Sequence, residues 1–117
     1  MRQLINRVAP AGPRQSIELE AKLFRGLGDP SRLSILRTLE GGERSVTSIV
    51  EETGLSQPNV SAHLACLREC GLVSFRQEGR SVFYSLADKR LHDIFRVAEG
   101  ILARVAERVY ECTRYKT

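Results

Sequence analysis

Residues 45–71 read SVTSIVEETGLSQPNVSAHLACLRECG and decide the fold. Ser45 and Ser56 each precede a short segment of helical periodicity, where a hydroxyl side chain accepts a hydrogen bond from the first turn of a helix. Gly54 stands between the two segments, where a helix can end in the left-handed conformation that glycine adopts easily. Two helices joined by such a turn form the helix-turn-helix pattern, whose second helix enters the DNA major groove. Because any pair of packed helices shows this pattern, it makes DNA binding only one hypothesis at this point.

Helices are also predicted on both sides of this pair. Residues 17–27 carry apolar side chains at helical spacing before Gly28, and the pair Asp29–Pro30 is typical of the start of another helix. After Asp88, which is expected to act as a cap, a long helix is predicted over residues 89–111. Its apolar positions recur every three or four residues: Leu91, Ile94, Phe95, Ala98, Leu102, Val105 and Val109.

Between these helices, residues 72–86 alternate apolar and polar side chains around the turn at residues 77–80, which predicts a β-hairpin. A hairpin directly after a helix-turn-helix favours a mainly α fold with a two-stranded wing, the winged helix-turn-helix. On this fold, Gln57, Asn59 and Ser61 in the first turns of the second helix are the candidate readers of base edges or nearby phosphates. Arg76 and Arg80 on the wing, and Arg68 on the helix's outer face, are candidate phosphate contacts.

Composition agrees with one small globular domain. The chain has 117 residues, 42% of them apolar and 27% charged, and a formal net charge of +4 that suits a polyanionic partner. We expect a flexible arm over residues 1–15 and one domain over residues 16–117. Apolar runs are too short to span a membrane and the N-terminal segment does not resemble a secretory signal, so a cytoplasmic location without a membrane partner is expected.

The apolar stripe of the last helix is longer than one small domain needs. Together with the first helix it predicts a homodimer, which would match two-fold symmetric operator DNA with half-sites one helical turn apart. The alternative is a helix that packs entirely within its own chain.

Three cysteines raise the question of metal or redox chemistry. Cys66 and Cys70 lie four residues apart on one flank of the second helix, about 80 to 120° from its apolar side. Their Cβ atoms should be about 5 to 6 Å apart, which suits two thiolates on one ion better than a disulfide. His63, one turn earlier, is a candidate nitrogen ligand, a DNA contact or a hydrogen-bonding group. Two cysteines at this spacing are ordinary small residues about as often as ligands, and Cys112 is distant in sequence.

Three stretches together resemble the ArsR/SmtB family of metal-responsive repressors: LGDPSRLSILRTL (residues 27–39), GLSQPNVSAHLACL (54–67) and GLVSFRQEGRSVFYSLAD (71–88). This resemblance implies a homodimer that represses a metal-resistance or efflux operon until a toxic ion binds. The segment HLACLRECGLV is similar to that of cadmium- and lead-sensing members. In that comparison Cys66 and Cys70 match the paired thiols of the recognition helix, and Cys112 matches a third thiol that the other subunit supplies.

The sequence also departs from other members of the family. Glu43, Arg44 and Ser45 stand where arsenic-binding or cadmium-binding members carry a C-x-C motif, and of the carboxylates and histidines of zinc and nickel sensors only Asp88 is matched. A set of thiolates favours thiophilic ions, so the expected effector is Cd(II) or Pb(II), followed by As(III), Hg(II) and Zn(II). No cofactor is expected to be needed for folding.

Two alternatives to metal sensing stay open. In the first, a redox-sensing or persulfide-sensing repressor of the same fold joins Cys66 or Cys70 to Cys112. The second is a thiol enzyme, but His63 is the only acid–base group near the paired cysteines in sequence and no Gly-rich phosphate loop is present. We therefore expect neither enzymatic activity nor a small organic substrate.

Overall fold

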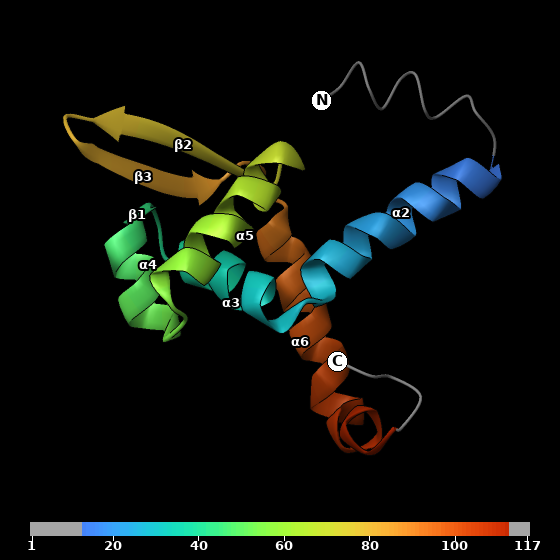
Figure 1. Cartoon of the computed structure of the whole chain (residues 1–117). Helices are drawn as coiled ribbons and strands as arrows, with labels where there is room; N and C mark the ends of the chain where they lie inside the picture. Colours follow the sequence, from blue (N-terminus) through green and yellow to red (C-terminus); the bar gives the residue numbers. More distant parts are fainter. Residues whose placement is uncertain (1–12, 113–117) are drawn as a thin grey trace.

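The computed structural model of the chain describes residues 13–112. Within this range, a small sheet whose neighbouring strands pair antiparallel lies at the edge of a group of helices (Figure 1). In chain order the elements are α2 (Pro13–Gly28), α3 (Pro30–Leu39), β1 (Arg44–Ser45), α4 (Val46–Thr53), α5 (Gln57–Glu69), β2 (Val73–Glu78), β3 (Ser81–Leu86) and α6 (Leu91–Glu111).

The predicted helix caps are confirmed. Asp29, Ser45 and Ser56 each accept a hydrogen bond from the backbone N–H three residues later, at 3.0, 3.2 and 3.3 Å. Gly54 ends α4 with a φ of +75°, in the left-handed region that side chains with a Cβ seldom adopt. These local interactions place α4 and α5 on either side of a short turn, as the helix-turn-helix pattern predicts.

The hydrophobic core lies where α3, α4 and α5 meet. In α5 the predicted apolar side is confirmed, because Val60, Leu64 and Leu67 are fully buried. The other fully buried large side chains are Ile35, Leu36 and Ile49. This packing fixes the orientation of α5, so its opposite side is turned outward from the domain.

The wing contains a third strand in addition to the expected hairpin. β2 and β3 pair antiparallel around Gly79, whose φ is +62°, and β1 pairs with the other edge of β3. Ser45 therefore both caps α4 and pairs with Phe83 in the sheet. The two-residue strand fastens the start of the helix-turn-helix to the wing.

The two outer helices differ from expectation at their starts. α2 begins at Pro13, three residues before the expected start of the domain, because the missing N–H of proline is tolerated in a first helical turn. Residues 1–12 of the predicted arm lie outside the described residues. α6 begins at Leu91, and Asp88 accepts from the N–H of Arg90 at 2.9 Å without standing at the N-cap position.

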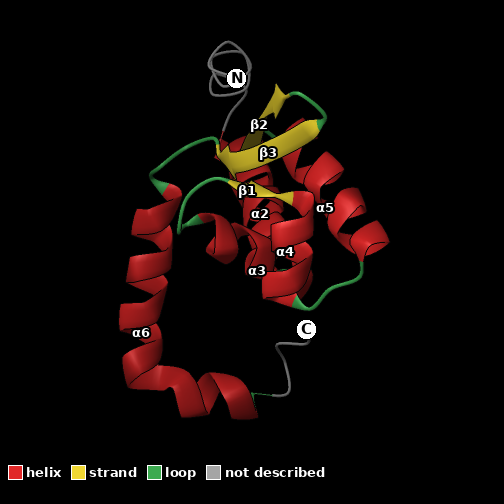
Figure 2. Ribbon diagram, turned by 90° about the vertical axis from the view of Figure 1, so that its left-hand side faces the viewer, coloured by secondary structure: helices red, strands yellow, loops and turns green. Residues whose placement is uncertain are grey.

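Much of α6 leaves the core of its own chain (Figures 1 and 2). Leu91 and Phe95 are buried, whereas beyond them Val97 is 62% and Ile101 56% exposed. Further exposed apolar side chains on α2 and α6 are Ile17, Leu19, Leu23, Phe24, Leu102, Val109 and Tyr110. No helix within residues 13–112 has both the length and the apolar character to cross a membrane.

Candidate DNA-binding surface and cysteine pair

The first two turns of α5 carry the predicted DNA-reading side chains. Gln57, Asn59 and Ser61 are all exposed. They are held there because Val60 and Leu64, between and after them, are buried in the core. Side chains on an outward helix terminus of this kind can enter a DNA groove, so the three residues stay predicted DNA contacts.

The two wing arginines have different surroundings. Arg80 occupies the turn after Gly79 and is exposed. Arg76, in the middle of β2, donates to both carboxylate oxygens of Glu43 at 2.7 and 2.9 Å and to Glu78 at 3.2 Å. Its guanidinium carbon also lies 4.9 Å from the ring centroid of Phe83. A phosphate that approaches Arg76 must therefore compete with these carboxylates.

Arg76 and its carboxylate neighbours stabilise each other in their charged forms. The hydrogen bonds from Arg76 to Glu43 and then to Glu78 raise the pKa of Arg76 above its ordinary value. In return, the Arg76 guanidinium lowers the pKa of the Glu43 carboxyl. The cluster holds one positive and two negative charges, so this part of the wing is less attractive to DNA than the sequence suggests.

Arg68 joins the recognition helix to the wing. Its guanidinium carbon lies 4.3 Å from the ring centroid of Phe75, a cation–π arrangement. Phe75 in turn lies 6.1 Å, between ring centroids, from Tyr84 on the neighbouring strand. Arg68, a candidate phosphate contact from the sequence, thus also holds α5 and the wing together.

Cys66 and Cys70 form an exposed pair of free thiols at the C-terminal end of α5. Desolvation by neighbouring atoms raises the pKa of the Cys70 thiol most, although Cys70 is on the surface, and repulsion and a hydrogen bond from Cys66 raise it further. Lys22 of α2 acts in the opposite direction. Residues four apart on a helix are neighbours on its surface, and each of these two thiols is near enough to influence the other. Any ion that binds both must displace their protons.

The other candidate ligands are not brought to this pair within one chain. Cys112, partly buried, follows the last turn of α6, which ends far from α5 in both views (Figures 1 and 2). The backbone N–H of Arg32 lowers the pKa of the Asp29 carboxyl most, and His63 contributes less, which places His63 near the cap of α3. In the part of the chain that the structure describes, no three His, Cys, Asp or Glu side chains form a potential metal site.

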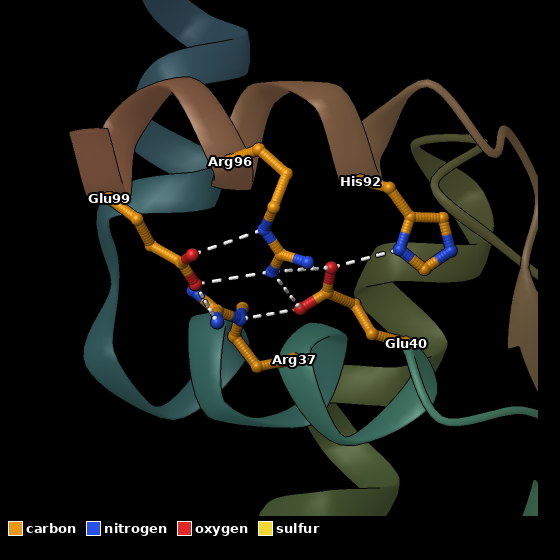
Figure 3. Close-up of polar contacts among 5 residues, drawn as sticks. All are labelled: Arg37, Glu40, His92, Arg96 and Glu99. Carbon is orange, nitrogen blue, oxygen red and sulfur yellow. Dashed lines mark hydrogen bonds and ion pairs between the residues drawn. The ribbon is translucent and has the colours of Figure 1, made fainter. Parts of the chain in front are cut away.

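A cluster of five charged or polar side chains joins α3 to α6 (Figure 3). This cluster was not predicted from the sequence. The clue was their spacing, because Arg37 and Glu40 are three residues apart and the α6 members lie one helical turn apart. We name this set the α3–α6 cluster: Arg37, Glu40, His92, Arg96 and Glu99. Only the fold brings the two groups together.

Comparison with known proteins identifies the family. Residues 29–74 match the model of the bacterial regulatory proteins of the arsR family. The chain is 44% identical over 94 residues to a protein of Streptomyces lividans described as a probable mercury resistance operon repressor, covering 80% of this chain and 75% of that one. The chain belongs to the ArsR family. It is also 48% identical over 71 residues to the regulator CmtR of Mycobacterium tuberculosis, covering 61% of this chain and 60% of CmtR.

A solved structure agrees with this family. The homodimeric winged helix-turn-helix DNA-binding domain of a possible ArsR-family regulator from Mycobacterium bovis superposes with a TM-score of 0.69 at 30% identity, covering 83% of this chain and 92% of that one. The predicted winged helix-turn-helix fold and ArsR-family resemblance are thereby confirmed. This ArsR-family chain is a DNA-binding transcriptional regulator and not an enzyme.

Proposed function

We propose that this ArsR-family chain is a homodimeric repressor that binds operator DNA without metal and is released when a thiophilic ion binds its cysteines. The observation that carries the proposal is the pair of exposed free thiols, one helical turn apart at the end of α5, the recognition helix. The similarity to a probable mercury resistance operon repressor supports a metal ion as the effector class. Cd(II) or Pb(II) is the preferred ion.

The exposed faces of α2 and α6 support the homodimer. An apolar groove on α6 is lined by Ile94, Val97 and Ile101, with Phe24 of α2 beside them. Large apolar side chains in contiguous exposed patches are uncommon on monomers and mark association surfaces. A second copy of this chain offers the matching apolar stripe about a two-fold axis.

Three thiolates form the proposed ligand set. Cys66 and Cys70 lie together at the end of α5, and the position of Cys112 at the end of α6 makes the partner subunit its expected source. A set of sulfur ligands without a carboxylate selects soft metal ions. The three proposed thiolates therefore fit an ion such as Cd(II) or Pb(II). The ion would supply a bridge between α5, the recognition helix, of one subunit and α6 of the other.

The effect on DNA follows from where these helices lie. A dimer reads both half-sites only if its recognition helices are about 34 Å apart, one turn of DNA. Because α5 carries both the DNA-reading residues and two of the thiols, a link from α5 to Cys112 alters that separation. Binding of the ion and binding of DNA then weaken each other equally.

Serine variants test the ligand set. In Cys66→Ser and Cys70→Ser we expect operator binding like that of the wild type, without release by Cd(II), in a fluorescence anisotropy titration. Cys112→Ser should also lose release by Cd(II) and by Hg(II), although two thiolates can still hold Hg(II), because no link from α5 to the end of α6 is left. If Cd(II) released Cys112→Ser as it does the wild type, the three-thiolate site would be wrong.

A mixed dimer tests whether the site spans two subunits. One subunit carries Cys66→Ser and Cys70→Ser, and the other carries Cys112→Ser. A site shared between subunits leaves one complete set of three thiolates in this dimer, so it should bind one Cd(II) with thiolate-to-metal absorption in the ultraviolet. A site within a single chain leaves no complete set, and this dimer would then bind Cd(II) no better than the Cys112→Ser homodimer.

Redox or persulfide sensing is the alternative use of the same thiols, and their exposure favours it. A peroxide would take two electrons and two protons from Cys66 or Cys70 and Cys112 as a disulfide forms. Two experiments separate redox sensing from metal sensing. Mass spectrometry of the oxidised protein detects a disulfide, and a series of ions added to the operator complex tests release by Cd(II), Pb(II), Zn(II), As(III) and Hg(II). Release by an oxidant and by none of the ions would favour redox sensing.

A further inference from the structure

The anchoring of α6 to its own domain is narrow. Leu91 and Phe95 in its first two turns are buried, and Ile94 packs against the core. From Val97 onward the large apolar side chains of α6 include several that are exposed, Ile101 and Leu102 among them. The direction in which α6 leaves the domain is therefore set by a few interactions near its start.

The α3–α6 cluster lies at this point of departure (Figure 3). Glu40, just after α3, has a side chain only 12% exposed and receives Arg37 at 2.6 Å, His92 at 2.9 Å and Arg96 at 3.1 Å. Glu99 of α6 pairs with Arg37 and, at 3.1 Å, with Arg96. Each carboxylate thus bridges the two helices.

The surroundings restrict how these side chains can move. The guanidinium carbon of Arg37 lies 5.2 Å from the ring centroid of the buried Phe95. A network of ion pairs around a mostly buried carboxylate is more constraining than an isolated surface pair, because each partner limits the geometry of the others. α3 itself is packed into the core through Ile35 and Leu36, so the cluster connects α6 to the rigid part of the domain.

We propose that the α3–α6 cluster positions α6 relative to the winged helix-turn-helix domain, and thereby sets the separation of the two recognition helices in the dimer. This inference rests on the proposed homodimer and on operator binding, and not on the proposed metal site. Glu40 is the central positioning residue, since three cationic or imidazole groups from both helices meet on its carboxylate. The residues of the cluster act through helix geometry and need not touch DNA.

The test uses a series of operator duplexes in which the distance between half-sites is changed one base pair at a time. Wild-type affinity should peak sharply at one spacing. In Glu40→Gln, the advantage of the best spacing over its neighbours should fall by about fivefold or more, within the usual range of coupling between sites. A loss of stability alone would weaken binding at every spacing and leave the peak in place.

Arg90→Gln is the matched control, because it removes an ion pair with Asp88 at an 84% exposed side chain next to α6 but outside the cluster. It should keep the wild-type peak. Arg96→Gln, at a more exposed site, should flatten the peak like Glu40→Gln, and the two changes together should have less than the summed effect. Thermal melting and sedimentation show that each variant is folded and dimeric.

A folded, dimeric Glu40→Gln or Arg96→Gln that retained the wild-type spacing preference would overturn the inference. A wild type that binds all spacings equally would overturn both this inference and the proposed reading of two half-sites. A wild type with a sharp spacing preference that no metal ion releases would contradict the proposed metal response alone, and the flattened peak of Glu40→Gln would still support the positioning role.

Discussion

At the scale of single residues, neighbours decide how much charge a side chain can offer to DNA. Glu43 and Glu78 hold the guanidinium of Arg76, whereas Arg80 at the tip of the wing is exposed. From the sequence the two arginines are equivalent candidates. Glu43 is 33 residues away from Arg76, so no local pattern indicates their pairing.

This difference predicts how binding depends on salt. Arg80→Gln should reduce the slope of log affinity against log salt concentration by about 0.9 for each phosphate that is no longer neutralised. Arg76→Gln should change it less. Glu43→Gln, which removes one of the two negative charges paired with Arg76, should steepen the slope. Anisotropy titrations at several salt concentrations measure all three, and equal reductions for the two arginine variants would contradict this ranking.

The pKa of Cys70 makes a separate prediction about pH. Because this pKa is raised, by desolvation first and by Cys66 next, the thiol is protonated at neutral pH and the ion must displace the proton. The apparent affinity for Cd(II) should therefore increase with pH from about 6 to 8, by up to about tenfold per pH unit for each proton displaced. Competition with a chelator of known pH dependence measures this affinity. A pH-independent affinity in this range would mean that the ion does not bind these thiols.

At the scale of helices and strands, features set by neighbouring residues were predictable. The caps at Asp29, Ser45 and Ser56 follow from short side chains placed directly before apolar periodicity. β1 was not predictable, because two residues have no strand pattern and it pairs with a strand about 40 residues later. The same limit applies to the α3–α6 cluster, whose members are 52 to 62 residues apart across the two helices.

The cap of α3 gives a direct stability test. Asp29→Ala should lower the free energy of unfolding by about 1 kcal/mol, whereas Asp29→Asn, which can still accept the hydrogen bond, should lower it much less. Denaturant titrations at one fixed protein concentration compare them. Equal decreases in both variants would mean that the cap does not stabilise α3.

The pH dependence of this effect has a defined direction. The N–H of Arg32 lowers the pKa of Asp29 in the folded protein, so the ionic part of the stabilisation is present above the unfolded value of about 3.9. It disappears as the pH falls through the lower folded pKa. The free energies of unfolding of the wild type and of Asp29→Ala, measured by the same denaturant titrations, should therefore become more similar in strong acid.

At the scale of the whole molecule, the apolar stripe of α6 was visible in the sequence but its partner was not. A helical stripe looks the same whether its own domain or a second subunit covers it. The structure leaves Val97 and Ile101 exposed beyond the anchored first turns. The location of Cys112 is a second case, because its distance from Cys66 and Cys70 depends on where the whole of α6 extends.

Two glutamate substitutions on the same stretch of α6 test the dimer surface. Ile101→Glu places a charge in the apolar groove and should convert the dimer to a monomer in sedimentation, with loss of operator binding. Ala103→Glu, exposed on the other side of the helix, should leave both unchanged. A dimeric Ile101→Glu would show that the subunits meet elsewhere.

The most direct test of the central claim is a titration of Cd(II) into the complex of the wild-type protein with its operator, followed by anisotropy. A coupling of about 3 kcal/mol lowers operator affinity about 150-fold, so the DNA should be released as the thiols fill. The double variant Cys66→Ser, Cys70→Ser should stay bound through the same titration. If the anisotropy of the wild-type complex did not change, or if the double variant were released equally, the thiol pair would not be the switch.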